Sequence, residues 1–345
     1  MNLEPFFGGL PQPTLATPPT TRWFGDGLEI PPDAIARQDL DDLHLLYQAL
    51  VDCYERWLDG RPDPDWADLA RRIRHFDESP LREALERLGL GTLADPDAPL
   101  VLRRALHDLR GGAFFALRMY GTLLADETPT EDLVQPAVLL ARDQAKLVRS
   151  LVPQIDPVGH RKDREEKAHG MKELVDKWEG FEFPGGDGGG DSRRRRPVMV
   201  EVGTLWRGTL AARCLEAAAL DRVLYNMINN AARFTADGRV RLQVELVASS
   251  TVRIAVANAV AEEQGAWIEK ETDGDASRLF LGGATRGGEG VGLQAAAAIV
   301  ARAWGQVMPG EAVETGAVGA RVRGGAFTAW IVWPALLGAT PAEAG

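Results

Sequence analysis

Three asparagines lie within one apolar stretch, "LYNMINNAARFT", residues 224–235. The stretch has a helical pattern, yet asparagine is unfavourable inside a helix because its side chain competes for backbone hydrogen bonds. Asn226 and Asn230 are one turn apart and share a face, and Arg233 follows on the next turn. Amide oxygens suit Mg²⁺, which bridges phosphates; arginine can bind phosphate oxygens, and Phe234 can stack on a base. The alternative is a helix whose asparagines face water or cap neighbouring loops.

A glycine-dense loop, "GGATRGGEGVGL", runs directly into a predicted helix at residues 282–293. Glycine can adopt backbone angles that are closed to other residues, so such a loop can present N–H groups and a helix N-terminus to an anion. No Gly-Lys-Ser/Thr follows, which excludes a Walker A loop. The candidate binding residues are Gly288, Gly290, Gly292 and Leu293.

Composition excludes several classes of protein. The chain has 345 residues, enough for two or three domains, and 45% of them are hydrophobic, which is typical of globular proteins. The net charge of −11 argues against a general nucleic-acid binder, and we interpret the basic run Arg193–Arg196 as a solvated linker patch. No apolar run approaches the roughly 20 residues of a membrane span. Cys53 and Cys214 have no metal-ligand spacing, so we expect a cytoplasmic protein with two buried thiols.

Two predicted helices precede the asparagine stretch. Residues 1–95 are expected to form a helical region of unknown role after an irregular start. Residues 98–125 and 131–152 each carry an apolar stripe, and together they predict a helical hairpin over residues 96–153. Two such helices bury too little surface alone, so we expect a second copy to complete a four-helix bundle in a homodimer. The stripe residues are Leu102, Leu106, Leu109, Ala113, Leu117, Tyr120 and Leu124, then Leu133, Ala137, Leu140, Gln144, Leu147 and Leu151.

The second half of the chain alternates between strand and helix patterns. Residues 154–198 are charged and Gly-rich and are predicted to be a linker or insertion. From residue 199 to 337, strands alternate with a helix expected at about 204–233 and another at 293–304, before a tail at 338–345. This pattern predicts an α/β sandwich, with helices on one face of a mixed sheet. The predicted fold class is therefore α+β, a helical part followed by the sandwich.

On these motifs, residues 199–334 resemble the ATP-binding catalytic domain of the GHKL type, which sensor histidine kinases share with gyrase. "NMINNAARFT" is similar to the N box of that family, "GEGVGL" to its second glycine box, and "GGAFTAWIVWP" to its closing strand. The resemblance implies ATP and Mg²⁺ as cofactors, with the metal on Asn230 and Asn226 supporting it. It also implies that Arg233 contacts phosphate and that Phe234 lies near adenine.

The resemblance extends upstream to "LHDLR", which is similar to the H box of the dimerisation and phosphotransfer domain. It implies that His107 accepts the phosphoryl group, with Asp108 and Arg110 beside it. The chemistry agrees, since a neutral imidazole can attack a phosphate while a neighbouring carboxylate holds the proton of the other ring nitrogen. The alternative is an exposed helical histidine without a role.

The first glycine box departs from the family pattern. The family has Asp-x-Gly-x-Gly, in which the aspartate accepts the adenine amino group, whereas this chain has Asn258, Val260 and Glu262. An asparagine oxygen can still accept one hydrogen bond, but without charge, and valine does not easily take a positive φ. We therefore expect weak nucleotide binding that depends mostly on the phosphates, and tighter, more selective ATP binding when Asn258→Asp and Val260→Gly together restore the box.

The resemblance implies a cytoplasmic histidine kinase of a two-component system. It would phosphorylate His107 from Mg·ATP and pass the phosphoryl group to an aspartate on the receiver domain of a response regulator. One alternative is a histidine phosphotransferase or pseudokinase with a degenerate ATP-binding domain, acting in a phosphorelay. Another is a scaffold in which residues 1–95 bind a partner. Neither a nucleic-acid partner nor a membrane span is expected.

Overall fold

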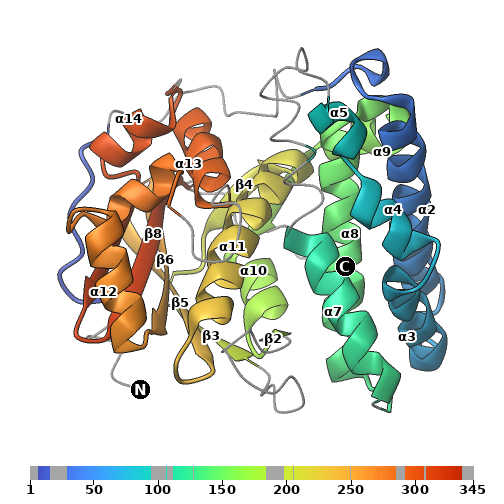
Figure 1. Ribbon diagram of the computed structural model, residues 1–345, viewed down its shortest axis with the longest axis horizontal. Coiled ribbons are helices and arrows are strands. Elements are labelled where there is room, and N and C mark those ends of the chain that lie inside the picture. Colours follow the sequence, from blue (N-terminus) through green and yellow to red (C-terminus); the bar gives the residue numbers. More distant parts are fainter. Residues whose placement is uncertain are drawn as a thin grey trace. The chain divides into compact units, whose positions relative to one another are not determined.

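The computed structural model describes residues 7–15, 29–94, 106, 112–126, 128–183, 198–204, 206–248, 250–284, 292–306 and 308–335. The chain divides into two compact units (Figure 1). One unit consists of residues 25–165 and is helical, and the other consists of residues 1–24 and 166–345 and contains the sheets. Each unit is described separately below.

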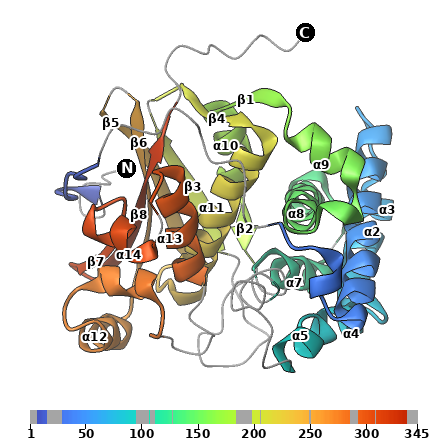
Figure 2. The same cartoon turned by 90° about the horizontal axis from the view of Figure 1, so that it is seen from above.

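In the part that the structure describes, the helical unit combines longer helices with several short ones. Helices α2, α3, α7 and α8 pack against one another as a bundle (Figure 2). In chain order the elements are η1 (Pro32–Ala34), α2 (Arg37–Asp59), α3 (Trp66–Arg74), η2 (His75–Asp77), α4 (Leu81–Arg87), α5 (Leu90–Ala94), α7 (Gly112–Asp126), α8 (Glu131–Leu151), η3 (Pro153–Ile155) and α9 (Pro157–Asp163).

The predicted apolar stripes form the core of this bundle. The helix expected at 131–152 is confirmed as α8, and the first hairpin helix is described at Leu106 and from Gly112 onward as α7. Most stripe residues that the structure describes are buried within this one chain, because α2 packs on α8 and α3 packs on α7 and α8. Leu133 is half-buried, and Leu102, Leu109 and Ala113 lie outside the residues whose side chains are described. The buried members are Leu106, Leu117, Tyr120, Leu124, Ala137, Leu140, Gln144, Leu147 and Leu151.

The premise that only a second chain can cover the stripes is therefore wrong. Residues 1–95 supply the covering helices, which the sequence patterns left without a role. The hairpin predicted as a separate domain at 96–153 belongs to the same compact unit as these helices. A homodimer stays a prediction, but the exposed stripe that motivated it is absent from the described part of α7 and α8.

A polar cluster joins α2, α8 and α9. The Tyr47 hydroxyl donates to Asp156 Oδ2 at 2.6 Å, and Arg149 Nη2 donates to Asp163 Oδ1 at 2.9 Å. Asp156 also caps α9 by accepting from the Gly159 N–H at 2.8 Å. Burial raises the pKa of Asp156, but the hydrogen bonds from Tyr47 and Gly159 outweigh it and hold that pKa below its usual value. The cluster fixes the end of the bundle by charge-assisted hydrogen bonds.

The second unit carries a six-stranded sheet and a two-stranded one. Its elements are β1 (Glu166–Gly170), α10 (Met171–Trp178), β2 (Glu182–Phe183), β3 (Val198–Thr204), β4 (Thr209–Arg213), α11 (Cys214–Phe234), β5 (Arg239–Ala248), β6 (Thr251–Ala259), α12 (Glu262–Glu271), η5 (Ala276–Leu281), α13 (Gly292–Ala303), α14 (Pro309–Glu314), β7 (Val318–Arg323) and β8 (Ala326–Pro334).

The larger sheet is mixed, as predicted. Its strand order is β2-β3-β5-β6-β8-β7; β3 and β5 are parallel, and the other neighbours are antiparallel. Helix α11 packs on β5 and β6, α13 packs on β8, and the two helices pack on each other (Figures 1 and 2). Every β6 residue from Thr251 to Asn258 is buried. Because successive side chains point to opposite faces of a strand, both faces of β6 are covered.

The N-terminal segment of residues 7–15 also belongs to this unit. Arg253 Nη2 on β6 donates to the Pro11 carbonyl at 2.6 Å, and Arg321 Nη2 on β7 donates to the Gly8 carbonyl at 2.7 Å. Phe7 and Leu10 are buried. These contacts explain why the N-terminal residues, which were expected only to be irregular, belong to the sheet unit. The helices that follow them in sequence belong to the other unit.

Two predictions for this half of the chain need correction. The stretch 154–198, expected to be a linker or an insertion, contains η3, α9, β1, α10 and β2 in its described part, so it is not a structureless linker. The helices expected at about 204–233 begin only at Cys214, because residues 209–213 pair as β4 with β1. Short strands of two to five residues give a weak alternation signal in sequence.

No helix in the described part of the chain is long and apolar enough to cross a membrane.

Candidate nucleotide site

Helix α11 places the asparagines at the edge of the sheet unit. Its apolar residues, among them Val223, Leu224 and Ile228, are buried against the sheet. Asn226 and Asn230 are half-buried on an adjoining face, and within the described part of the chain their amide groups make no hydrogen bond. Buried amides normally have partners. The helix therefore carries two polar groups one turn apart that can still bind a ligand.

The end of the glycine loop lies against this face. A Cβ atom added to Gly292 would lie 3.4 Å from Asn226 Oδ1, so the loop's last glycine and the helix are in close approach. Before the loop, Gly282 and Gly283 have φ of +84° and +91°, and Gln294 Nε2 ties α13 back to the Leu281 carbonyl at 3.0 Å. The last glycine of this loop therefore lies beside Asn226 of α11. Leu293 is half-buried in the first turn of α13, and Gly288 and Gly290 lie outside the described residues.

Arg233 and Phe234 end the same helix. Arg233 is exposed, and its guanidinium carbon lies 5.4 Å from the centroid of the Phe234 ring. This is cation–π distance. The arrangement places an exposed guanidinium group at the C-terminal end of α11.

Asn258, which the sequence resemblance aligns with the family aspartate, lies on β6, the strand on which α11 packs. It is 1% exposed, and its Nδ2 donates to the Ala259 carbonyl at 3.0 Å. Its Oδ1 is buried and has no hydrogen-bond partner among the described residues. An unsatisfied buried acceptor costs about 1–3 kcal/mol. A ligand that donates an N–H there would remove this cost, and the adenine amino group is such a donor.

The first glycine box is absent from the structure as well as from the sequence. The Val260 N–H donates to the Gly325 carbonyl at 2.9 Å, Ala261 is the N-cap of α12, and Glu262 is its first residue. The chain therefore passes from strand to helix without a glycine turn. Asp273 and Asp275, which follow α12, have local partners: Asp273 pairs with Arg278, and Asp275 caps η5.

Metal binding would depend on few protein ligands. Among the described residues, no group of three or more His, Cys, Asp or Glu side chains is placed to hold a metal ion. A Mg²⁺ ion on the amide oxygen of Asn230 would take its other ligands from phosphates and water, which is how Mg²⁺ is usually held beside nucleotides. The donor set therefore fits Mg²⁺ only together with a nucleotide.

No protein-family model matches the chain, and no curated protein matches it. Among solved structures, the mycobacterial sensor histidine kinase MprB matches with 15% identity and a TM-score of 0.29 over 50% of this chain and 98% of its own. The Acinetobacter baumannii histidine kinase AdeS matches with 15% identity and a TM-score of 0.24 over 67% of this chain and 95% of its own. Full-length ShkA in complex with AMPPNP matches with 20% identity and a TM-score of 0.30 over 80% of this chain and 46% of its own.

The structural neighbours of this chain are sensor histidine kinases. At TM-scores below 0.5 these matches say nothing about individual residues, so the roles proposed below depend on this chain's own contacts. Of the H box, His107, Asp108 and Arg110 lie outside the described residues. Leu106, directly before them, is helical and fully buried in the bundle core.

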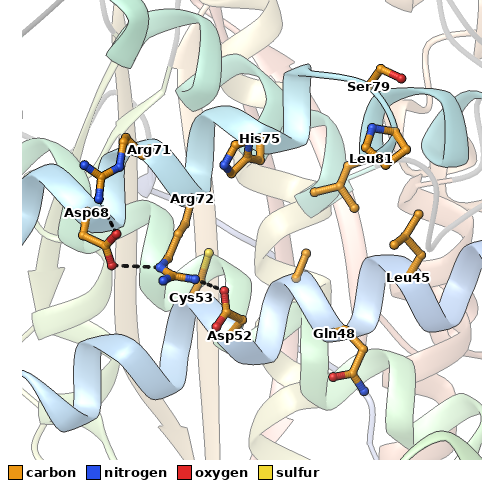
Figure 3. Close-up of a pocket in the computed structure, with 12 residues that line it drawn as sticks. Leu45, Gln48, Asp52, Cys53, Asp68, Arg71, Arg72, His75, Ser79 and Leu81 are labelled. Atoms are coloured by element: carbon orange, nitrogen blue, oxygen red, sulfur yellow. Dashed lines mark hydrogen bonds and ion pairs between the residues drawn. The ribbon is translucent and has the colours of Figure 1, made fainter.

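A pocket of about 580 Å³ lies in the helical unit, where no sequence pattern indicated a site (Figure 3). Its two arginines bind carboxylates that also line it: Arg71 and Arg72 both donate to Asp68, and Arg72 also pairs with Asp52. These hydrogen bonds lower the pKa of Asp68. The arginines are thus engaged by carboxylates, and the pocket gives no independent sign of an anionic ligand. Sequence could not reveal it, because its lining comes from α2, α3, η2 and the start of α4.

Proposed function

We propose that this chain is a histidine kinase of two-component signalling that binds Mg·ATP where α11, β6 and the start of α13 meet. The observation that carries the proposal is the buried Oδ1 of Asn258, which lacks a donor on the strand that supports α11. The contact between Gly292 and Asn226 supports it, because it joins the two glycine- and asparagine-rich motifs at one place.

Each residue then has a role that its environment allows. Asn258 accepts a hydrogen bond from the adenine amino group, and Asn230 provides an amide oxygen to Mg²⁺ with Asn226 beside it. The exposed Arg233 binds phosphate oxygens. Gly292 lets the backbone approach the phosphates at the N-terminus of α13, where the helix dipole favours an anion. Bound ATP supplies the phosphoryl group.

His107 is the proposed acceptor. An imidazole nitrogen of His107 forms a bond to the γ-phosphorus while the bond from that phosphorus to the oxygen of ADP breaks, and Asp108 holds the proton on the other ring nitrogen. Arg110 follows Leu106 closely in the sequence and would balance the added phosphate charge. The phosphoryl group then passes to an aspartate carboxylate on a response-regulator receiver domain.

A second candidate is a histidine phosphotransferase that uses a phosphorylated receiver and no nucleotide. The hydrogen bond from Val260 to Gly325 favours it, because this bond replaces the glycine turn that the resemblance expects beside the base. In that case the asparagine face of α11 would keep its packing role without Mg·ATP.

Calorimetry on the full chain with ATP and Mg²⁺ separates the two candidates. We expect weak binding that Asn230→Ala abolishes and that Asn229→Ala leaves nearly unchanged. Asn229 is the matched control because it is also half-buried on α11, yet it does not share the face of Asn226 and Asn230. No binding at millimolar ATP would refute the kinase proposal.

Phosphorylation assays test His107 with both donors. Under the kinase proposal, acid-labile label from ATP appears in the natural chain and disappears in His107→Gln. Label from a phosphorylated receiver but not from ATP would support the phosphotransferase instead. Undiminished label in His107→Gln would show that another residue is the acceptor.

A further inference from the structure

Residues 7–15, here called the strap, lie against one face of the large sheet (Figure 2). It is the face to which Arg253 and Arg321 point, since both side chains donate to strap carbonyls. The strap adds the buried side chains of Phe7 and Leu10 to these contacts. This face of the sheet therefore already binds a peptide segment, through arginine donors and main-chain carbonyl acceptors.

Strand register shows what else lies on this face. Trp330 of β8 is paired with Ala255 of β6 on one side and with Gly319 of β7 on the other. Ala255 is two residues from Arg253, and Gly319 is two residues from Arg321, so all these positions share one face of the sheet. The Trp330 ring lies against Gly319, where an added Cβ atom would overlap it. The face thus has an aromatic floor on β8 between an arginine on each neighbouring strand.

Two buried N–H groups on this face have no acceptor in the part of the chain that the structure describes, Arg253 Nε and Trp330 Nε1. Arg253 is 3% exposed, and Trp330 is 4% exposed. The strap carbonyls accept from the Nη atoms of the arginines and leave these two donors unpaired. Buried donors usually have partners, so the two N–H groups favour a ligand that brings further acceptors.

This side of the face is also positively charged. Burial lowers the pKa of Arg321, and the neighbouring charges of Arg323 and Arg253 lower it further. Burial also lowers the pKa of Arg253, although the carboxylate of Glu245, 3.0 Å away, opposes the effect. The surroundings of Arg253 and Arg321 therefore disfavour their positive charge, and an anionic ligand would reverse this.

The acidic residues farther along the same face are engaged elsewhere. Glu201 on β3 binds Arg239 at 2.8 Å, and Asp237 binds Arg241 at 2.7 Å. These pairs belong to the β3 and β5 side of the sheet, which β6 and β8 separate from β7. The strap itself contains no acidic side chain. Its carbonyls can satisfy hydrogen bonds on the β6–β8–β7 side, but only a ligand with carboxylates can also neutralise the charge there.

One strap position is placed to hold such a carboxylate. Gly9 has a φ of +69°, in the left-handed region that Asp and Asn enter more readily than other residues with a side chain. A Cβ atom at Gly9 would lie 3.7 Å from Nη1 of Arg323, which is exposed. Asp and Asn at this position share the same backbone strain, so they differ mainly in charge.

We propose that the face formed by β6, β8 and β7 is a docking surface for an acidic peptide segment of a partner protein, and that the strap is its occupant within the chain. Carboxylates of the partner segment accept from Arg253 and Trp330, and its main-chain carbonyls repeat the contacts of the strap. The partner segment therefore replaces the strap. The proposal is independent of the nucleotide site, because Asn258 is five residues from Arg253 and points to the other face of β6.

Synthetic peptides with the strap sequence are the probes. One carries Gly9→Asp, and its matched control carries Gly9→Asn, which has the same shape without the charge. Fluorescence anisotropy measures their binding to the full chain with Leu10→Ser, a substitution that weakens the chain's own strap because Leu10 is buried. We expect saturable binding that is roughly 2- to 5-fold tighter for the aspartate peptide, with no difference between the two at about 1 M salt.

A variant of the surface locates the effect. Arg323→Gln in the same chain should remove the preference for aspartate over asparagine. Arg239→Gln is the matched control, because Arg239 is an exposed arginine of this face on β5, away from β7. The proposal is overturned if the two peptides bind equally at low salt, or if a scrambled aspartate peptide binds as tightly. Absence of binding at millimolar peptide overturns it as well.

A second measurement leaves the strap in place. In the full chain with Gly9→Asp or Gly9→Asn, hydrogen exchange reports strap release through the Thr14 N–H, which donates to the Thr315 carbonyl at 2.8 Å. We expect this N–H to exchange roughly 2- to 5-fold more slowly with aspartate than with asparagine. Equal exchange in the two variants would show that a carboxylate gains nothing on this surface, and the proposal would be wrong.

Discussion

Replacing Asn258 by leucine separates the stability of the sheet from recognition of the base. Two effects on stability oppose each other. The variant loses the bond from Nδ2 to the Ala259 carbonyl, which contributes about 1 kcal/mol. That carbonyl still accepts from the Ala236 N–H at 2.8 Å, so it is not left unsatisfied. The variant also removes the unpaired Oδ1, which costs about 1–3 kcal/mol. We therefore expect an unfolding free energy that is unchanged or slightly higher.

Nucleotide affinity should respond in the opposite direction. In the natural chain, the adenine amino group satisfies the buried oxygen, whereas leucine leaves that amino group without an acceptor. The expected loss is about 1–3 kcal/mol, which is about a 5- to 150-fold weaker ATP affinity. Guanine has a carbonyl oxygen in place of the amino group and would face Oδ1 as a second acceptor. The preference for ATP over GTP should therefore disappear in the variant.

Calorimetry for binding and urea denaturation for stability measure the two quantities on the same preparations. Thr251→Val is the matched control, because Thr251 is 7% exposed on the same strand, about 23 Å from Asn258 at roughly 3.3 Å per residue. An Asn258→Leu chain that binds ATP as tightly as before, with its preference over GTP intact, would show that Asn258 does not contact the base. A loss of several kcal/mol in stability would show instead that Oδ1 has a partner.

Three further outcomes follow from particular contacts. Asn258→Asp alone should not tighten ATP binding, because it places a carboxylate against the Ala259 carbonyl. The unfolding free energy, measured by urea denaturation, should fall by about 2–4 kcal/mol at pH 7. The decrease should be smaller at pH 4, where the carboxyl group is more often protonated. Tyr47→Phe should cost roughly 1–2 kcal/mol at pH 7. The pKa of Asp156 is lowered in the folded chain, so its ionised carboxylate stabilises the fold above the unfolded pKa of about 4, and this stabilisation is lost as the pH falls through the folded pKa. The difference in unfolding free energy between Tyr47→Phe and the natural chain should therefore shrink in acid. Tyr54→Phe, on the same helix, is the control and should show no such trend. Finally, α2 and α3 close the bundle within one chain. The unfolding midpoint of the helical unit should therefore be the same over about a hundredfold range of protein concentration, from about 1 to about 100 µM. A midpoint that rises with concentration would show that a second copy completes the core.

Local patterns determined much of the fold. The apolar spacing of residues 131–152 gave α8 almost to its ends, and the strands β5, β6 and β8 follow from their β-branched and alternating runs. The positions of Asn226 and Asn230 on one face follow from the helical period alone. These features depend on residues close in sequence, so a single chain is enough to predict them.

The tertiary structure decided which surfaces cover which. The stripe on α7 and α8 could be closed by a second copy or by other helices, and only the packing of α2 and α3 shows that this chain closes it itself. The unpaired Oδ1 of Asn258 is also invisible in sequence, because satisfaction of a buried group depends on every neighbour in space. Sequence fixes which chemical groups are present and their local period, whereas their burial, pairing and charge state arise from contacts between distant segments.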